Sequence, residues 1–346
     1  MSATETAQTH RHDSDVVIIG GGPAGCSTGI FCAREGLDTV IFDRGTSSIQ
    51  RCAHLENYLG FPAGIDIETF YELIHDHAET AGCEIVPDLV ESVERADDSD
   101  GFVIELQEGD PITARRVVAA TRYDAEYMCG FDDDAMFETY EHDGEDHERF
   151  DRSYPDDDGT TPVESLYVAS PSEETDTQAI MAAGRGARVA HRVIADARMD
   201  DGWWQKAAEG VDWVRREANL TDKWADRERL IEWFDDYYGE DAPVGPESDR
   251  FQRVRETYID ARLSVYLSDD EIDARAERAH ETLADCLNPS ALTAAFEDDT
   301  ARDSDEADAE RAIDELGSKT VLDALDDEII EAYVTEHGLV EAKGHR

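Results

Sequence analysis

The chain has 346 residues, of which 83 are acidic and 31 basic, giving a net charge of -52 at pH 7. This balance excludes nucleic acid and anionic membranes as partners, because both bind basic patches. Repulsion among so many carboxylates strains a compact fold in ordinary salt, but at molar salt the screening length falls to about 3 Å. We therefore expect a cytoplasmic protein of a salt-accumulating halophile. An acidic mesophilic binding protein is the alternative, although the presence of only four lysines argues against it.

Six cysteines occur, with no C-x-x-C pair among them. Cytosolic cysteines are normally reduced, and the spacing of Cys26 and Cys32 suits neither a redox pair nor a metal site. Residues 1–13 are polar, so we expect a disordered tail and no secretory signal. No stretch approaches the roughly 20 apolar residues of a membrane span.

The first half of the sequence alternates strand and helix patterns. A short β-branched run ending in glycine predicts a buried strand, and the segment after it predicts a helix that stops at Gly36. Later runs alternate apolar and polar residues, which is typical of antiparallel strands. The pattern predicts an α/β fold with a small antiparallel insertion, with strands over 15–20, 38–45, 83–95, 101–109 and 114–122 and helices over 23–36 and 65–82.

Residues 131–161 are acidic and short of aliphatic side chains, so we expect a loop-like, solvated linker. His142 and His147 among these acids leave a metal site as the less favoured alternative. Beyond the linker, residues 164–170 predict a strand and residues 177–197 a helix.

From residue 198 onward the sequence predicts an all-helical domain. Residues 268–271 form a capping box, from Ser268 to Glu271, and residues 320–334 have the pattern of an amphipathic helix. The tryptophans could line a ligand groove, but the core of a small helical bundle is the favoured interpretation; they are Trp203, Trp204, Trp213, Trp224 and Trp233. The predicted organisation is thus a tail (1–13), an α/β domain (14–197) interrupted by the acidic linker (131–161), and a helical domain (198–346).

Residues 20–25, Gly-Gly-Gly-Pro-Ala-Gly, fit G-x-G-x-x-G after a predicted strand and at the start of a predicted helix. In this motif Gly20 makes the tight turn, Gly22 lets the backbone approach a pyrophosphate and Gly25 allows the helix to pack closely on the strand. Asp43 ends the next strand about 20 residues later, where a carboxylate can bind ribose hydroxyls. Together these features predict a dinucleotide site.

The segments "DVVIIGGGPAGCSTGIFCAREG", "HLENYLGFPAGIDIETF", "RRVVAAT" and "LYVAS…TQAIMAAG" resemble, in this order, the flavin domain of thioredoxin reductase-like flavoproteins. The resemblance implies a three-layer Rossmann-like domain with a parallel sheet, and FAD as the cofactor. It also implies a homodimer. The residues it assigns to FAD are Gly20, Gly22, Pro23, Ala24, Gly25, Asp43, Arg44, Asn57, Thr121, Arg122, Gln178 and Ala179.

The sequence departs from this family in three places. The acidic linker cannot hold the second dinucleotide domain, which needs on the order of 100 residues. The redox-active C-x-x-C of that domain is missing too, so no NADPH-to-disulfide relay is expected. Pro171 stands where the family has an aspartate that binds the ribityl chain, and Arg122 replaces a glycine. We expect these two changes to weaken FAD binding without abolishing it.

Three functions compete. The favoured one is an FAD-dependent oxidoreductase that takes electrons from an external donor or a small-molecule substrate. The alternative is a non-catalytic flavin- or nucleotide-binding sensor whose helical domain binds a protein partner, and the third is a fold without a cofactor. No catalytic residue is assigned. His54 and Cys52 could face the flavin, but neither is favoured, and His75 and His77 diverge on their helix.

Overall fold

The computed structural model describes residues 13–96, 101–122, 125–142, 145–170, 178–210, 215–218 and 226–286. The chain divides into two compact units, one comprising residues 1–213 and 231–259 and the other residues 214–230 and 260–346. Several predictions concern parts outside the described residues, namely the tail up to residue 12, Pro171, Trp213, Trp224 and the helix over 320–334.

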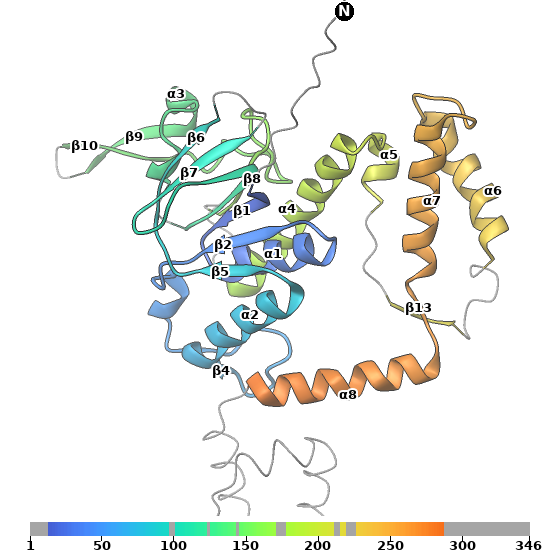
Figure 1. Cartoon of the computed structure of the whole chain (residues 1–346). Coiled ribbons are helices and arrows are strands. Elements are labelled where there is room, and N and C mark those ends of the chain that lie inside the picture. Colours follow the sequence, from blue (N-terminus) through green and yellow to red (C-terminus); the bar gives the residue numbers. More distant parts are fainter. Residues whose placement is uncertain are drawn as a thin grey trace, which may run out of the picture. The chain divides into compact units, whose positions relative to one another are not determined.

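The first unit is built on a seven-stranded sheet (Figure 1). β5, β2, β1, β8 and β11 are parallel neighbours in this order, and β7 and β6 continue antiparallel from the first half of β8. This arrangement is the predicted Rossmann-like fold with an antiparallel insertion. The strand bounds are Ser14–Ile19 (β1), Thr39–Phe42 (β2), Glu84–Val86 (β5), Val90–Arg95 (β6), Phe102–Leu106 (β7), Ile112–Ala120 (β8) and Leu166–Ser170 (β11), and a short pair, His54–Leu55 (β3) and Ile65–Asp66 (β4), lies outside the sheet.

Both faces of the parallel strands are buried, which explains their uninterrupted apolar sequences. In β1, Val16 and Ile18 pack against the helices, whereas Val17 and Ile19 pack on the opposite face. Three helices cover the first face: α1 (Pro23–Arg34), α2 (Ile67–Ala81) and α4 (Ala179–Asp200). The antiparallel strands and residues 125–154 cover the second, so the unit has three layers.

Residues 131–161 are not the loop-like linker that the sequence predicts. They contain a short helix, α3 (Asp133–Met136), and a β-hairpin of β9 (Phe137–His142) and β10 (Glu145–Phe150). Met136 and Phe150 are buried in the core beneath the sheet, and Phe137 packs beside them. A few apolar residues at the open end of the hairpin, where Phe137 pairs with Phe150, are thus enough to dock it, while the acids of residues 138–141 and 146–148 stay exposed. Among the described residues, no group of His, Cys, Asp and Glu side chains could hold a metal ion.

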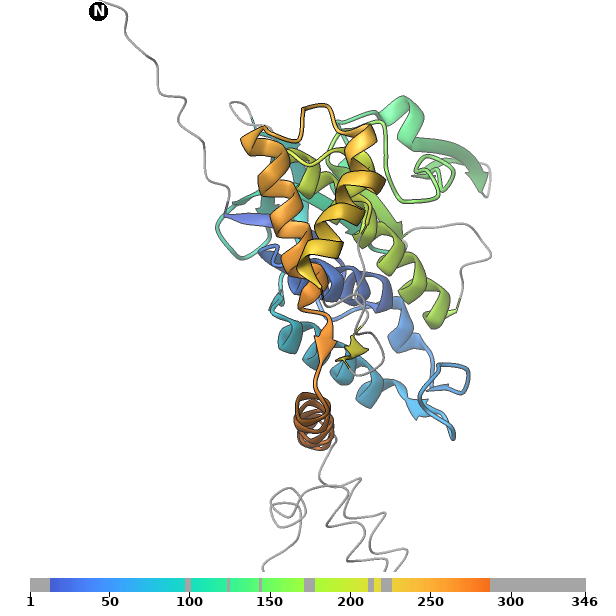
Figure 2. The same cartoon turned by 90° about the vertical axis from the view of Figure 1, so that its right-hand side faces the viewer.

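The helical region after α4 has an aromatic core within the first unit. Trp204 stacks on Phe251 with ring centroids 5.4 Å apart and donates a hydrogen bond from its indole to the Tyr238 carbonyl at 3.1 Å. Trp203 is also buried there and Trp233 packs against the cluster, as expected for a bundle core. The helices are α5 (Gln205–Ala208), α6 (Arg227–Tyr238) and α7 (Asp249–Leu263), and α6 and α7 lie side by side in Figure 2.

Unlike the all-helical domain that the sequence predicts, the second unit contains two short strands. Two-residue strands, β12 (Arg216–Glu217) and β13 (Tyr266–Leu267), form a parallel pair. α8 (Asp269–Cys286) follows, and its capping box is confirmed, because Glu271 accepts hydrogen bonds from the Ser268 amide at 2.9 Å and from its hydroxyl at 2.8 Å.

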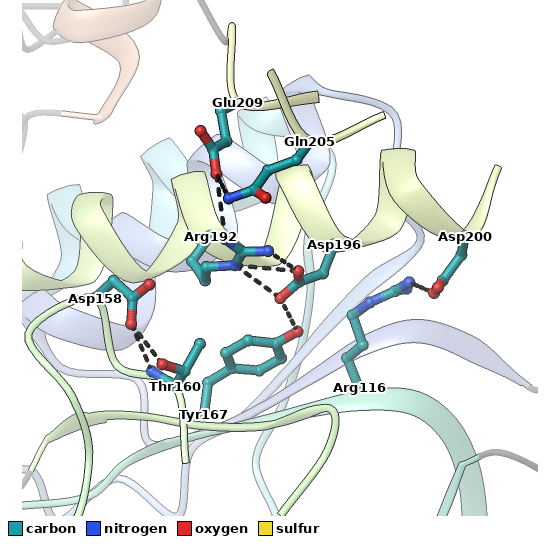
Figure 3. A network of polar contacts seen from close by, with 9 residues as sticks. All are labelled: Arg116, Asp158, Thr160, Tyr167, Arg192, Asp196, Asp200, Gln205 and Glu209. Atoms are coloured by element: carbon teal, nitrogen blue, oxygen red, sulfur yellow. Dashed lines mark hydrogen bonds and ion pairs between the residues drawn. The ribbon is translucent and has the colours of Figure 1, made fainter. Parts of the chain in front are cut away.

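A polar network fixes α4 to the sheet (Figure 3). The hydroxyl of the buried Tyr167 donates a hydrogen bond to Asp196 at 2.7 Å, and Arg192 forms an ion pair with the same carboxylate. Burial, and next the Asp196 charge, raise the pKa of Tyr167, so its hydroxyl stays protonated as a donor. Arg116, buried on β8, pairs with Asp200 one turn further along α4. Charged side chains thus orient the helix whose N-terminus reaches the site described below.

Alanine substitutions at two glycines of α4 should change the stability of the protein in opposite directions. A Cβ at Gly186 would collide with the carbonyl oxygen of Ala24 on α1, whereas a Cβ at the exposed Gly184 would meet nothing within 4 Å. We expect Gly186→Ala to lower the free energy of unfolding by about 3 kcal/mol, as overpacking does. Gly184→Ala should raise it by about 0.5–1 kcal/mol through helix propensity. Denaturant unfolding in molar KCl measures both, and equal effects of the two variants would contradict the close approach of the helices.

Candidate functional site

The glycine loop joins β1 to α1 in the conformation that its motif requires. Gly20 has φ +114°, and a Cβ there would lie 2.8 Å from the Ala120 carbonyl oxygen. A Cβ at Gly25 would collide with the Gly20 carbonyl oxygen, so only glycine lets α1 start this close to the strand. Gly22 is the N-cap of α1 and no side chain caps the helix, which leaves its first amides available to an anion.

A cavity of about 360 Å³ lies over this loop, within the range of ligand pockets. Its walls include the last residues of four parallel strands: Ile19 of β1, Phe42 of β2, Ala120 of β8 and Ser170 of β11. In doubly wound sheets, ligands bind at the carboxyl ends of the strands, where the order of the strands reverses. Here β1 is the reversal point, because β2 lies on one side of it and β8 on the other.

The described residues of the cavity wall carry a net charge opposite to that of the whole chain. Four arginines and two aspartates among them line the cavity, although acids outnumber bases almost threefold in the sequence; these residues are Arg44, Arg51, Arg122, Arg152, Asp43 and Asp88. Asp88 accepts hydrogen bonds from the backbone amides of Leu89 at 2.7 Å and Gly109 at 2.9 Å, which disperse its charge. The wall therefore favours an anionic ligand.

Two side chains of α2, Tyr71 and His75, contact the Asp43 carboxylate. The Tyr71 hydroxyl donates a hydrogen bond to one carboxylate oxygen, and the Gly45 amide donates to the other at 3.1 Å. His75 Nε2 lies 2.9 Å from the Gly21 carbonyl, which can only accept, so Nε2 carries the proton and donates to it, and the same nitrogen lies 3.4 Å from the Asp43 carboxylate. Tyr71 and His75 lie outside the cavity wall, so they orient Asp43 without touching a ligand.

The sequence predicts no role for Tyr71, and for His75 it predicts only that its side chain diverges from that of His77. Their contacts confirm the divergence, since His77 lies 3.1 Å from Arg34 and away from the site. The signal that could have found the pair is its i, i+4 spacing on a helix that follows the Asp43 strand.

The structure brings most of the predicted cofactor residues to one wall. Gly25 and Asn57 are the exceptions. Gly25 acts through close packing, and Asn57 donates a hydrogen bond to the Gln178 side chain at 2.8 Å, which ties its loop to the start of α4. The residues that line the cavity are Gly20, Gly22, Pro23, Ala24, Asp43, Arg44, Thr121, Arg122, Gln178 and Ala179.

Arg122 does not have the positive φ that would strain an arginine at a glycine position. Among the described residues, Ser165 is the non-glycine residue with positive φ. The side chain of the preceding Thr121 is anchored by a hydrogen bond to the Tyr127 hydroxyl at 2.8 Å. The substitution of glycine by Arg122 therefore adds a cation to the wall without a backbone penalty.

The thiols near the site fall into two kinds. Cys26 is buried, and its thiol donates to the Gly21 carbonyl at 3.2 Å. Burial, and next the Asp43 charge, raise the pKa of this thiol, so it remains protonated and unreactive. Cys52 is exposed and lines the cavity, whereas the exposed His54 does not.

Comparison with known proteins shows what the N-terminal part of the chain is similar to. Residues 14–140 match the pyridine nucleotide-disulphide oxidoreductase family. Residues of the chain are 36% identical over 85 positions to NADPH-dependent thioredoxin reductase 3 of Arabidopsis thaliana, covering 23% of this chain and 16% of the relative. They are 33% identical over 129 positions to the bifunctional thioredoxin reductase/thioredoxin of Mycobacterium leprae, covering 36% and 27%. The N-terminal part of the chain is thus similar in sequence to parts of thioredoxin reductases.

The chain spans less than a third of the length of these two curated relatives. Among solved structures, the atypical thioredoxin reductase TRi from Desulfovibrio vulgaris Hildenborough has a TM-score of 0.44 at 17% identity, over 55% of this chain and 100% of its own. A thioredoxin reductase from Gloeobacter violaceus also has a TM-score of 0.44, at 16% identity, over 60% and 100%. No helix in the described part of the chain is long and apolar enough to cross a membrane.

Tyr71 makes the stability of the site sensitive to alkaline pH. Burial, followed by the hydrogen bond to Asp43, raises the pKa of Tyr71 well above its ordinary value of about 10. Above about pH 10 the unfolded chain therefore loses this proton while the native protein keeps it, so the free energy of unfolding falls as pH rises. We expect Tyr71→Phe to show a shallower fall between about pH 9 and 11 than the wild type.

Denaturant unfolding at a series of pH values in molar KCl measures this slope. Tyr237→Phe, the same change at an exposed tyrosine of α6, is the control. Identical slopes for Tyr71→Phe and the wild type would show that the Tyr71–Asp43 contact does not persist in solution.

Proposed function

We propose that the protein is an FAD-dependent oxidoreductase, related to thioredoxin reductase, that takes electrons from an external donor. The observation that carries the proposal is the arginine-lined cavity over the glycine loop, in a chain whose net charge is -52. Arginines in such a wall would bind the phosphates of a ligand through charge-assisted hydrogen bonds. The comparisons support a flavin enzyme of the pyridine nucleotide-disulphide oxidoreductase type over other classes of dinucleotide protein.

The residues present fit FAD. The glycine loop gives a cradle that a Cβ would fill, since a Cβ at Gly22 would lie 2.9 Å from the Ser47 hydroxyl. The open N-terminus of α1 suits the pyrophosphate, and the Asp43 carboxylate, oriented by Tyr71, suits the hydroxyls of the adenosine ribose. Asn57 and Gln178, joined by their hydrogen bond, would hold the isoalloxazine end.

A bound flavin would supply hydride and single-electron chemistry, and the part of this chain would be to bind the cofactor, orient it and exclude water. The 346 residues contain one G-x-G-x-x-G and no C-x-x-C, so we propose that reducing equivalents come from free NAD(P)H, a ferredoxin-like protein or an organic substrate. We further propose a halophilic cytoplasmic setting, in which molar salt screens the acidic surface.

A non-catalytic flavin- or nucleotide-binding sensor is the second candidate. Its one structural support is that no general base, nucleophile pair or metal cluster is assembled in the described part of the cavity wall. The relatives that the chain matches are oxidoreductases, which favours the enzyme.

The test begins with protein purified in molar KCl. We expect an oxidised flavin spectrum, near-stoichiometric FAD after denaturation, and turnover with at least one donor under dye-linked assay. Flavin content without turnover on any donor would favour the sensor. Colourless protein that does not take up added FAD would refute a flavoprotein of either kind.

Asp43→Asn gives a residue-level prediction. The amide keeps the shape of the carboxylate but loses the charge-assisted hydrogen bonds to the ribose, which are worth about 1.5–3 kcal/mol. We expect the dissociation constant for FAD, measured by fluorescence titration of apoprotein in molar KCl, to rise about 10- to 100-fold. Asp110→Asn, at an exposed position after β7, is the control. Unchanged FAD affinity in Asp43→Asn would remove Asp43 from the proposed site.

A further inference from the structure

Arg152 has no role in the sequence-based site, yet its side chain lines the cavity. It follows the β9–β10 hairpin, the part of the chain that the acidic composition marks as a linker. Among the described residues no carboxylate pairs with Arg152, although the sequence around it is rich in aspartate. The neighbouring Arg149, by contrast, pairs with Glu138 at 2.7 Å across the hairpin.

The backbone that carries Arg152 is fixed at several points. Residues 151–154 form a turn in which the Tyr154 amide donates to the Asp151 carbonyl at 3.0 Å, with Arg152 at the second position. The Asp151 side chain accepts hydrogen bonds from the Ser153 amide at 2.9 Å and its hydroxyl at 2.7 Å. The Tyr154 hydroxyl donates to Asp132 at 3.1 Å. These hydrogen bonds hold the backbone at Arg152 in place, although the Arg152 side chain itself is exposed.

The sheet order places cations on both sides of the glycine loop. Arg44 and Arg51 follow β2, which neighbours β1 on one side, and Arg122 follows β8, the neighbour on the other. The hairpin packs on the face of the sheet beneath β8 and adds Arg152 to the same wall. At molar salt, charges act over about 3 Å, so an arginine in this wall affects a ligand only through direct contact.

We propose that Arg152, in the turn that follows β10, is a ligand-binding residue that contacts a phosphate of the nucleotide. This inference deepens the proposed function and requires a phosphate-bearing ligand, but it does not require that ligand to be FAD. Guanidinium is suited to this contact because its planar donors match phosphate oxygens in pairs.

The test compares full-length wild type, Arg152→Ala and Arg149→Ala in molar KCl, titrated calorimetrically with FAD, ADP and adenosine. For Arg152→Ala we expect about 10- to 100-fold weaker binding of FAD and ADP, the loss of one charge-assisted contact, and unchanged binding of adenosine, which has no phosphate. Arg149→Ala changes the same residue type on the same hairpin and should bind all three ligands as the wild type does. The affinity of Arg152→Lys for FAD and ADP should lie between those of the wild type and Arg152→Ala, because lysine keeps the charge without the paired donors.

Equal ADP affinity for Arg152→Ala and wild type would overturn the proposal. A matching loss in Arg149→Ala would also overturn it, by showing that the effect comes from the stability of the hairpin. Wild-type protein that binds ADP but not FAD would refute the proposed flavin function while leaving the Arg152 contact to be decided by the ADP series. Wild type that binds neither ligand would refute both.

Discussion

The site depends on two places where the backbone of α1 touches another backbone segment directly, the glycine loop at one and α4 at the other. Gly25 lets the first turn of α1 lie against the Gly20 carbonyl, and Gly186 lets α4 lie against the Ala24 carbonyl. Neither approach leaves room for a Cβ, so the positions of two helix N-termini are set by steric exclusion. Both termini then meet at the carboxyl edge of the sheet, where Gln178 and Ala179 share a cavity wall with the glycine loop.

Electrostatics determine what this geometry can hold. A chain with 83 acids tends to repel an anion, yet among the described residues the acids that line the cavity are Asp43 and Asp88. The Asp88 carboxylate accepts a hydrogen bond from the Gly109 amide, and the Asp43 carboxylate accepts hydrogen bonds from the Tyr71 hydroxyl and the Gly45 amide. These donors partly offset both negative charges. Among the described residues of the wall, arginines thus outnumber aspartates four to two, so a site for a phosphate-bearing ligand is compatible with a very acidic chain.

The α/β fold, the glycine loop and Asp43 could be predicted because each depends on local sequence: β-branched runs, glycine spacing and an acid at a strand end. The hairpin could not, because Met136 and Phe150 lie at its two ends and the acids between them dominate the composition. Tyr71, His75 and Arg152 were missed for a related reason. Tyr71 and His75 act through tertiary contacts with the ends of β2 and β1, and their i, i+4 spacing points to these contacts only once the helix is known to lie beside Asp43. Arg152 reaches the cavity from a segment whose composition is that of a linker.

High salt also bears on selectivity. With a screening length of about 3 Å, four arginines cannot concentrate anions from a distance, and dissolved anions compete at each one separately. A small ion can satisfy one or two of these groups, whereas the proposed dinucleotide would contact the glycine loop, Asp43 and the arginines at once, and its first contact would raise the effective concentration for the next. Spreading the contacts over segments from β2, β8 and the hairpin therefore favours a long ligand over free phosphate. If the chain works in molar salt, as we propose, selectivity would come from the number of simultaneous contacts more than from the strength of any one.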